Sequence, residues 1–293
     1  MEWVFFSILG AFGQALSWGL KTKALNQSNV NNLTGFVGYA AAGATLTLLY
    51  LFLKKGDVVH LTTTFWVTMF FIVVLNVIAA WTGYRAIDKG NLSMLMPFIS
   101  LTALTIVPIE YVLRDTVPTI HQLWGIGVVV LGAIGIAMKE KPTKESFAVA
   151  EYFAVTLICY SITSPLMGVA VYESGSGLFT AVVMHLGIAL GFVPLLLISR
   201  EHNIIRELRR EGRFTQLFMW MVLAGVVIAI FENGPINVAL ETATASEVFA
   251  LKRTMPFFAL ILGVLMFNEK ITRRHMFGTA FLVIGSALII WYR

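Results

Sequence analysis

Long apolar runs separated by short polar breaks make up this chain from one end to the other. A helix needs about 20 apolar residues to cross the hydrocarbon core of a bilayer, which is about 30 Å thick. Ten runs approach or exceed this length, at 3–20, 33–53, 65–84, 92–113, 120–138, 147–171, 177–199, 216–239, 245–267 and 275–292. The pattern predicts an all-α membrane protein with ten transmembrane helices.

The polar breaks carry most of the basic residues, and they do so unevenly. Alternate breaks, beginning with the first, hold most of the lysines and arginines. The positive-inside rule then places both termini outside the cytoplasm and the Arg-rich segment 200–213 inside it. Ile204, Ile205 and Leu208 give that segment an apolar face, which predicts a helix lying at the membrane interface. We expect a multi-pass protein of the cell inner membrane.

Composition excludes a soluble protein. Hydrophobic residues make up 58% of the chain and charged residues 13%, and the mean hydropathy is +0.81. Soluble domains carry about 25% charged residues. The net charge of +5 suits a nucleic-acid partner, but the basic residues fall mostly in the breaks. We therefore expect membrane lipid and a small-molecule substrate as partners, and no nucleic acid.

The chain contains an internal repeat. Displaced by 153 residues, segment 86–137 aligns with 239–290 without a gap. Gly125 then falls on Gly278, and Gly132 on Gly285. With five spans in each half, residues 1–140 and 147–293, the second half enters the membrane inverted relative to the first. Inverted repeats are typical of secondary transporters, which bind their substrates near the midplane.

The second repeat also carries a family resemblance. The residues concerned are Ala239-Leu240, Thr244 to Pro256, Leu265 to Thr272, and Gly278 with Gly285, with Ser17-Trp18-Gly19 in the first span. They resemble the EamA-type domain of the drug/metabolite transporter superfamily. The resemblance implies ten helices, arranged as two inverted five-helix repeats around a central cavity, and transport without ATP. It also implies cytoplasmic termini in several members, against the distribution of charge.

Lys252 and Arg253 stand near the middle of the ninth span. Each charge at the bilayer centre costs about 2.5–3.5 kcal/mol, so the pair needs anionic partners or a wet cavity. The triose-phosphate and nucleotide-sugar branch of the superfamily carries a similar pair that binds phosphate, which implies a substrate-anion site. The alternative is internal ion pairing, with Glu232 or Glu247 as the charge partner.

Glu232, Asn233 and Asn237 form a second polar cluster, in the eighth span. Gly234-Pro235 interrupts the helix there and frees backbone carbonyls that a cavity or a partner helix must satisfy. We interpret the cluster as part of a substrate cavity, in which Glu232 neutralises a lysine or couples to protons. The alternative is contact between helices.

Polar and aromatic residues of other spans are further candidates for the cavity wall. Gln14 and Trp18, Asn76 and Tyr84, and Tyr160 lie in the first, third and sixth spans and can bind a polar solute. Taken singly, each also suits helix packing. His185, central in the seventh span, is a candidate proton shuttle or a hydrogen-bonded structural histidine.

Three prolines fall inside the fourth and ninth spans, which the repeat relates. Proline removes a backbone hydrogen bond and kinks a helix. We hypothesise that Pro97, Pro108 and Pro256 are hinges by which each half opens and closes.

No metal-ligand spacing, nucleophile elbow or nucleotide-binding loop occurs in the sequence, so we expect no metal, no cofactor and no enzymatic activity. The sequence favours a secondary transporter that moves a small polar metabolite with an anionic group by alternating access. One alternative is an exporter of amino acids or of neutral or cationic metabolites, in which the buried charges are structural. The others are a channel, an intramembrane enzyme and a non-transporting scaffold.

Overall fold

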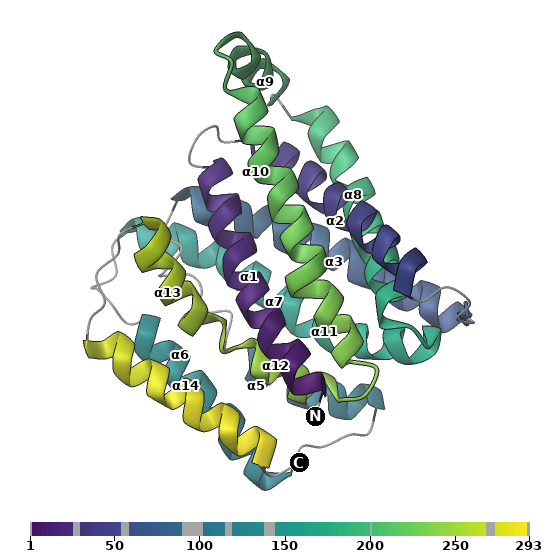
Figure 1. The fold of residues 1–293 in the computed structure, drawn as a ribbon, viewed down its shortest axis with the longest axis vertical. Coiled ribbons are helices and arrows are strands. Elements are labelled where there is room, and N and C mark those ends of the chain that lie inside the picture. Colours follow the sequence, from purple (N-terminus) through teal and green to yellow (C-terminus); the bar gives the residue numbers. More distant parts are fainter. Residues whose placement is uncertain are drawn as a thin grey trace.

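The structure is a computed structural model that describes residues 2–25, 30–53, 59–89, 102–114, 119–137, 144–199, 201–267 and 273–291. Over these residues all regular elements are helices (Figure 1). The first half contains α1 (Glu2–Leu25), α2 (Asn31–Leu53), α3 (Thr63–Lys89), α5 (Thr102–Arg114) and α6 (Ile120–Ala137). The second half contains α7 (Lys144–Ser174), α8 (Gly177–Ile198), α9 (Glu201–Arg210), α10 (Phe214–Val227), the π-helix η1 (Ile228–Asn233), α11 (Gly234–Ala239), α12 (Ala245–Lys252), α13 (Met255–Phe267) and α14 (Arg273–Trp291).

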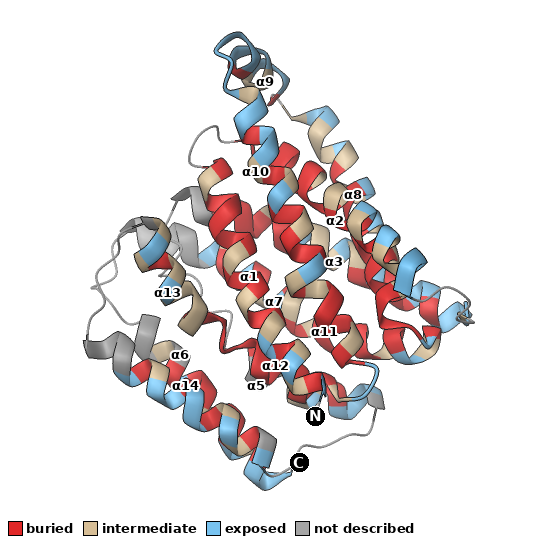
Figure 2. Ribbon diagram, viewed as in Figure 1, coloured by how far each residue is buried: buried red, intermediate tan, exposed pale blue. Residues whose placement is uncertain are grey.

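Length and apolar composition suit the described helices to a membrane. Seven helical segments can cross one, at 2–25, 31–53, 63–86, 151–174, 177–198, 214–239 and 245–266. Phe52 and Ile198 are 82% and 84% exposed, which only a lipid environment makes favourable. Exposed positions alternate with buried ones along α14 (Figure 2). The prediction of an all-helical membrane protein therefore agrees with the fold, whereas the number of ten spans remains a prediction.

Two of the predicted spans are not continuous helices. The eighth contains α10, η1 and α11, so its α-helical hydrogen bonding changes before Pro235. The ninth is divided into α12 and α13 by a turn at Arg253 and Thr254. Residues 92–101 of the fourth span lie outside the described residues.

Small residues bring α6 and α14 together as neighbours (Figure 1). A Cβ atom on Gly125 would lie 2.9 Å from the Gly285 carbonyl oxygen, and one on Gly132 would lie 2.7 Å from that of Gly278. The repeat pairs Gly125 with Gly278 and Gly132 with Gly285. Exchanging the two halves therefore exchanges these two contacts, as a two-fold axis would.

Other helix contacts follow the same exchange. The first helix of one half packs on the third of the other: α1 contacts α10, η1 and α11, and α7 contacts α3. Likewise α1 contacts α13, and α7 contacts α5. The helices α2 and α8 contact each other. The halves are therefore intertwined, and the largest apolar core draws residues from both.

Glycines on α1 allow close contact with the interrupted helix. Pro235 has no N–H to donate to the carbonyl of Phe231, four residues earlier. That carbonyl packs directly against Gly13, where a Cβ atom would overlap it, and a Cβ on Gly10 would lie 2.5 Å from Ile236. The contact holds η1, and Glu232 within it, against the polar face of α1.

Carboxylates cap the N-terminus of α12 from two directions. Glu110, on α5, accepts hydrogen bonds from the backbone N–H groups of Ala245 (2.7 Å) and Ser246 (2.6 Å). Glu247 forms a capping box with Thr244 on α12 itself. These acceptors satisfy N–H groups that a buried helix end would otherwise leave unpaired. A residue of the first half thereby fixes the helix that carries Lys252.

We expect Gly125→Ala to lower the melting temperature of the detergent-purified protein, because the added methyl group meets Gly285 and Ile289 at 3.0 Å or less. Overpacking of this kind costs about 1–3 kcal/mol. Gly127→Ala is the control on the same helix, since a Cβ atom there has no neighbour within 4 Å. It should leave the melting temperature unchanged or raise it. Equal effects of the two changes would contradict the close contact between α6 and α14.

We expect Glu110→Ala to destabilise the protein by about 2–4 kcal/mol, because it leaves two buried N–H groups of α12 without an acceptor. Thermal unfolding followed by tryptophan fluorescence measures this loss. Glu173→Ala is the control, since Glu173 accepts its hydrogen bond from Thr62 at an exposed site. If Glu110→Ala lowered stability no more than Glu173→Ala does, the capping role of Glu110 would be contradicted.

Candidate functional site

A polar cavity of about 40 Å³ lies among the helices of both halves. A buried water needs about 10–15 Å³ on the same kind of measure, so the cavity holds about three waters and no organic solute of ordinary size. The cavity is lined by Gln14, Trp18 and Lys21 of α1, Tyr39 of α2, Asn76 of α3, Tyr160, Thr163, Ser164 and Met167 of α7, Met184, His185 and Ile188 of α8, Ile228, Glu232 and Asn233 of η1, Phe249 and Lys252 of α12, and Arg253.

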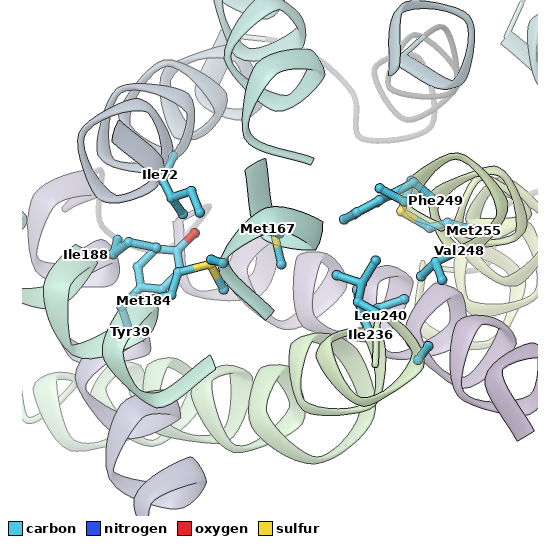
Figure 3. Packing of buried hydrophobic residues seen from close by; sticks show 14 of the residues in the cluster. Tyr39, Ile72, Met167, Met184, Ile188, Ile236, Leu240, Val248, Phe249 and Met255 are labelled. Atoms are coloured by element: carbon cyan, nitrogen blue, oxygen red, sulfur yellow. The ribbon is translucent and has the colours of Figure 1, made fainter. Parts of the chain in front are cut away.

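Apolar side chains form two separated parts of the cavity wall. Tyr39, Met184 and Ile188 gather on one side, and Phe249 lies on the other, with Met167 between them (Figure 3). The polar groups that line the same cavity come mainly from α1, α7, η1 and the end of α12. A solute in this space would meet an apolar wall and a charged wall.

Lys252 and Glu232 form a buried ion pair at the charged wall. Lys252 Nζ lies 3.5 Å from Glu232 Oε1, and the two side chains are 6% and 7% exposed. The other oxygen, Oε2, accepts a short hydrogen bond of 2.7 Å from Ser17 on α1. Ser17 therefore fixes the carboxylate more tightly than Lys252 does. The 3.5 Å separation leaves Lys252 with only a loose bond, which an incoming anion can replace.

Asn233 links Lys252 to His185. Its Oδ1 accepts from Lys252 Nζ at 3.4 Å, and its Nδ2 donates to His185 Nε2 at 3.2 Å. His185 Nδ1 donates to the Ala181 carbonyl at 2.8 Å. Both ring nitrogens are thereby engaged in the neutral tautomer. The contacts match the structural interpretation of His185, although its ring also borders the cavity.

The C-terminal end of α12 explains why two cations can be buried at this site. The last carbonyls of a helix carry a partial negative charge, which favours cations. Lys252 is the last residue of α12, and Arg253 is its C-cap. The Arg253 guanidinium is 2% exposed and lies 5.9 Å from the centre of the Phe249 ring. The break in the ninth span thus places both charges beside the cavity, although successive helical residues would point about 100° apart.

The structure brings most of the predicted site residues together. Those that line the cavity are Lys252, Arg253, Glu232, Asn233, Asn76, Trp18, Gln14, Tyr160 and His185. Asn237 is not among them, because its side-chain amide bonds within its own helix. Its Nδ2 donates to the Asn233 carbonyl at 2.7 Å. Tyr84 packs behind the wall, against Phe192.

Two predicted roles differ from the observed contacts. Glu247, expected as a charge partner of the Lys252-Arg253 pair, caps α12 at its opposite end and accepts from Gln122 at 3.2 Å. Pro256 lies in the first turn of α13, where a missing N–H breaks no helical bond, because the helix already ends at Arg253. Pro108 lies inside α5 and is exposed. Pro97 lies outside the described residues.

Lys21 and Tyr39 are among the cavity residues that the sequence analysis does not select. Lys21 follows the apolar run 3–20, so it counts as a charge of the first break. The helix instead continues to Leu25, and Lys21 is 4% exposed. The spacing of Gln14, Trp18 and Lys21, at i, i+4 and i+7, is the signal that places it on the cavity face. Groups of three metal-ligating side chains are absent from the described residues.

Comparisons with known proteins place this geometry in context. Among curated proteins, none matches the chain by sequence. A crystal structure of a protein aligns with 98% of this chain and 97% of its own, at a TM-score of 0.69 and 13% identity, which shows likeness of fold alone. Residues 150–291 match the EamA-like transporter family, whose members are membrane transporters of small molecules rather than enzymes, and the match confirms the resemblance seen in the sequence. Residues 150–291 are therefore similar to an EamA-like transporter domain, and the long apolar helices suit a multi-pass membrane protein.

Proposed function

We propose that the protein is a secondary transporter that moves a small polar metabolite with an anionic group by alternating access. One observation carries the proposal: Lys252 and Arg253 both line the polar cavity among the helices. Two cations in the membrane interior cost about 5–7 kcal/mol on insertion scales. We therefore expect these two residues to have a function that offsets this cost. Binding an anion between the helices is such a function.

The contacts between the halves support alternating access. The α6–α14 glycine contacts and the pairing of α1 and α7 with equivalent helices exchange when the halves exchange. An inverted repeat built in this way has two equivalent openings, one to each side of the membrane. The cavity of about 40 Å³ suits the closed state between them. We infer ten transmembrane helices in two inverted five-helix repeats.

Glu232 has a defined part in the proposed cycle. In the closed cavity its Oε1 lies beside Lys252, so it neutralises the lysine when no solute is bound. An entering anion competes with Glu232 for Lys252, and Ser17 holds the displaced carboxylate in place. Glu232 therefore limits the affinity of the site for the anion and allows the anion to dissociate.

The ion pair also favours a second candidate. If Lys252 and Glu232 serve only to fix α12 against η1, the protein is an exporter of amino acids or of neutral or cationic metabolites. A non-transporting scaffold would need the pair for the same reason. Anion binding by variants of Lys252, Arg253 and Glu232 distinguishes these cases from the first proposal.

We expect Lys252→Gln and Arg253→Gln each to weaken binding of anionic solutes by about 10–100-fold, as expected for loss of a charge-assisted hydrogen bond. Thermal shift of the purified protein against organic acids, phosphorylated sugars and amino acids identifies the solutes. Titration of each variant then measures the loss.

Lys23→Gln is the matched control, because Lys23 lies on α1 over Trp220 and does not line the cavity. Since Lys252→Gln leaves Glu232 without its cation, the double variant Lys252→Gln with Glu232→Gln restores charge balance and separates folding from binding. Undiminished anion binding by the double variant and by Arg253→Gln would end the anion-site proposal.

We expect Glu232→Gln to act in the opposite direction, tightening anion binding while slowing counterflow in proteoliposomes. The amide no longer competes for Lys252, so the bound anion leaves more slowly. Weaker binding with faster exchange would instead show that Glu232 contacts a cationic solute, as the exporter alternative requires.

A further inference from the structure

Lys21 lies on the face of α1 that holds the carboxylate of Glu232. Ser17 Oγ, on the same helix, donates to Glu232 Oε2 at 2.7 Å. Lys21 follows Ser17 by four residues, and side chains four apart in a helix are neighbours, with Cβ atoms about 5–6 Å apart. Lys21 and Glu232 both line the cavity. The carboxylate is therefore fixed one helical turn from the position that carries Lys21.

Glu232 is shared by cations on two different helices. Its Oε1 lies 3.5 Å from Lys252 Nζ, on α12. The charge of the same carboxylate also acts on Lys21, on α1. Both lysines are buried, and each limits how strongly Glu232 holds the other. Among the described residues that line the cavity, Glu232 is the one carboxylate that can take this part.

Three aromatic rings keep Lys21 in place beside the cavity. Its Nζ lies 5.5 Å from the ring centres of Trp18 and Tyr39 and 5.6 Å from that of Tyr84. Cation–π contacts of this kind stabilise a desolvated ammonium group without neutralising it. The rings come from α1, α2 and α3. Lys21 therefore keeps its charge and its position while other contacts in the cavity change.

We propose that Lys21 is a positioning residue, which stabilises the charge of Glu232 while a solute anion occupies Lys252. This inference rests on the proposed function and adds a step to it. In the empty cavity, Glu232 shares its charge between Lys252 and Lys21. The entering anion replaces Glu232 Oε1 beside Lys252, and the displaced carboxylate then depends on Lys21 and Ser17. Without Lys21 this displacement is harder, because a buried carboxylate that loses a cation is costly.

The exchange also strengthens the contact between the two halves when the site is occupied. Glu232 and Lys252 both belong to the second half, whereas Ser17 and Lys21 belong to the first. An ion pair within one half thus gives way to an ion pair between the halves. Lys21 thereby links the arrival of the anion to the relative position of the halves, which alternating access requires.

A double-mutant cycle separates this role from direct contact with the solute. Lys21→Met, Glu232→Gln and the double variant are compared with the wild type, as full-length protein in detergent. Titration measures Kd for butyrate and for glycerol 3-phosphate at equal ionic strength, and melting temperature is measured with and without each probe. Lys23→Met is the matched control, because it removes a lysine of the same helix that does not line the cavity.

We expect Lys21→Met to weaken binding of the probe that the wild type binds by about 10-fold, a coupling of the size found between neighbouring groups. In the Glu232→Gln background the same change should cost no more than about threefold, because no carboxylate is then displaced. Without a probe, Lys21→Met should lower the melting temperature more in the wild type than in Glu232→Gln, since only the wild type loses an attractive pair. Lys23→Met should leave Kd unchanged.

Three results would overturn the positioning role. An equal loss of affinity in both backgrounds would show that Lys21 contacts the anion itself. Additive changes in melting temperature would show that Lys21 and Glu232 do not interact. A lower melting temperature of Lys21→Met with an unchanged Kd would make the lysine purely structural. If Lys21→Met does not fold, the double variant should still fold, and failure of both would likewise assign Lys21 to structure alone.

The measurements also distinguish this inference from the proposed function. If anion binding depends on Lys252 but not on Lys21, the anion site stands and the positioning role is wrong. If neither probe nor any anion of the wider screen binds the wild type, the proposed function fails. The inference then fails with it, even where Lys21 and Glu232 are coupled in the melting temperatures.

Discussion

Charges and free backbone groups inside a membrane protein must find partners without bulk water. In this chain the broken ninth span concentrates that demand at α12, a helix of eight residues with both ends in the interior. Glu110 and Glu247 satisfy its N-terminus, and its C-terminal carbonyls favour Lys252 and Arg253. Lys252 in turn needs Glu232, which Ser17 fixes from α1. The cavity lies beside this series of pairings, at the C-terminal end of α12.

Contacts between the halves keep these partners in place. A carboxylate of the first half caps α12 of the second, and Gly13 of α1 leaves room for the Phe231 carbonyl of η1. Because residues of each half contact the other half in this way, the positions of the charged residues depend on how the two halves are placed relative to each other. A change in that position therefore alters the site itself, which is what a transport cycle requires.

The sequence predicts most of the helices because apolar runs of about 20 residues have few other folds available. It also selects most of the cavity wall, since polar groups within such runs are rare and must face the interior. Asn237 escapes this logic because its amide donates to the Asn233 carbonyl of the preceding turn. Lys21 escapes it because a lysine normally ends an apolar run. The rings of Tyr39 and Tyr84, on helices distant in the sequence, keep Lys21 inside. Contacts between distant helices decided the position of Lys21, and linear spacing does not contain them.

The charged part of the cavity wall and its apolar parts differ in how far their atoms can move. Backbone contact between Gly13 and Phe231 holds the charged wall, so it has little room to adjust. Met167 and Met184, in the apolar parts of the wall, have flexible side chains that repack around different shapes (Figure 3). Under the proposed function, selection should therefore be strict toward the placement of an acidic group and permissive toward the carbon skeleton that carries it.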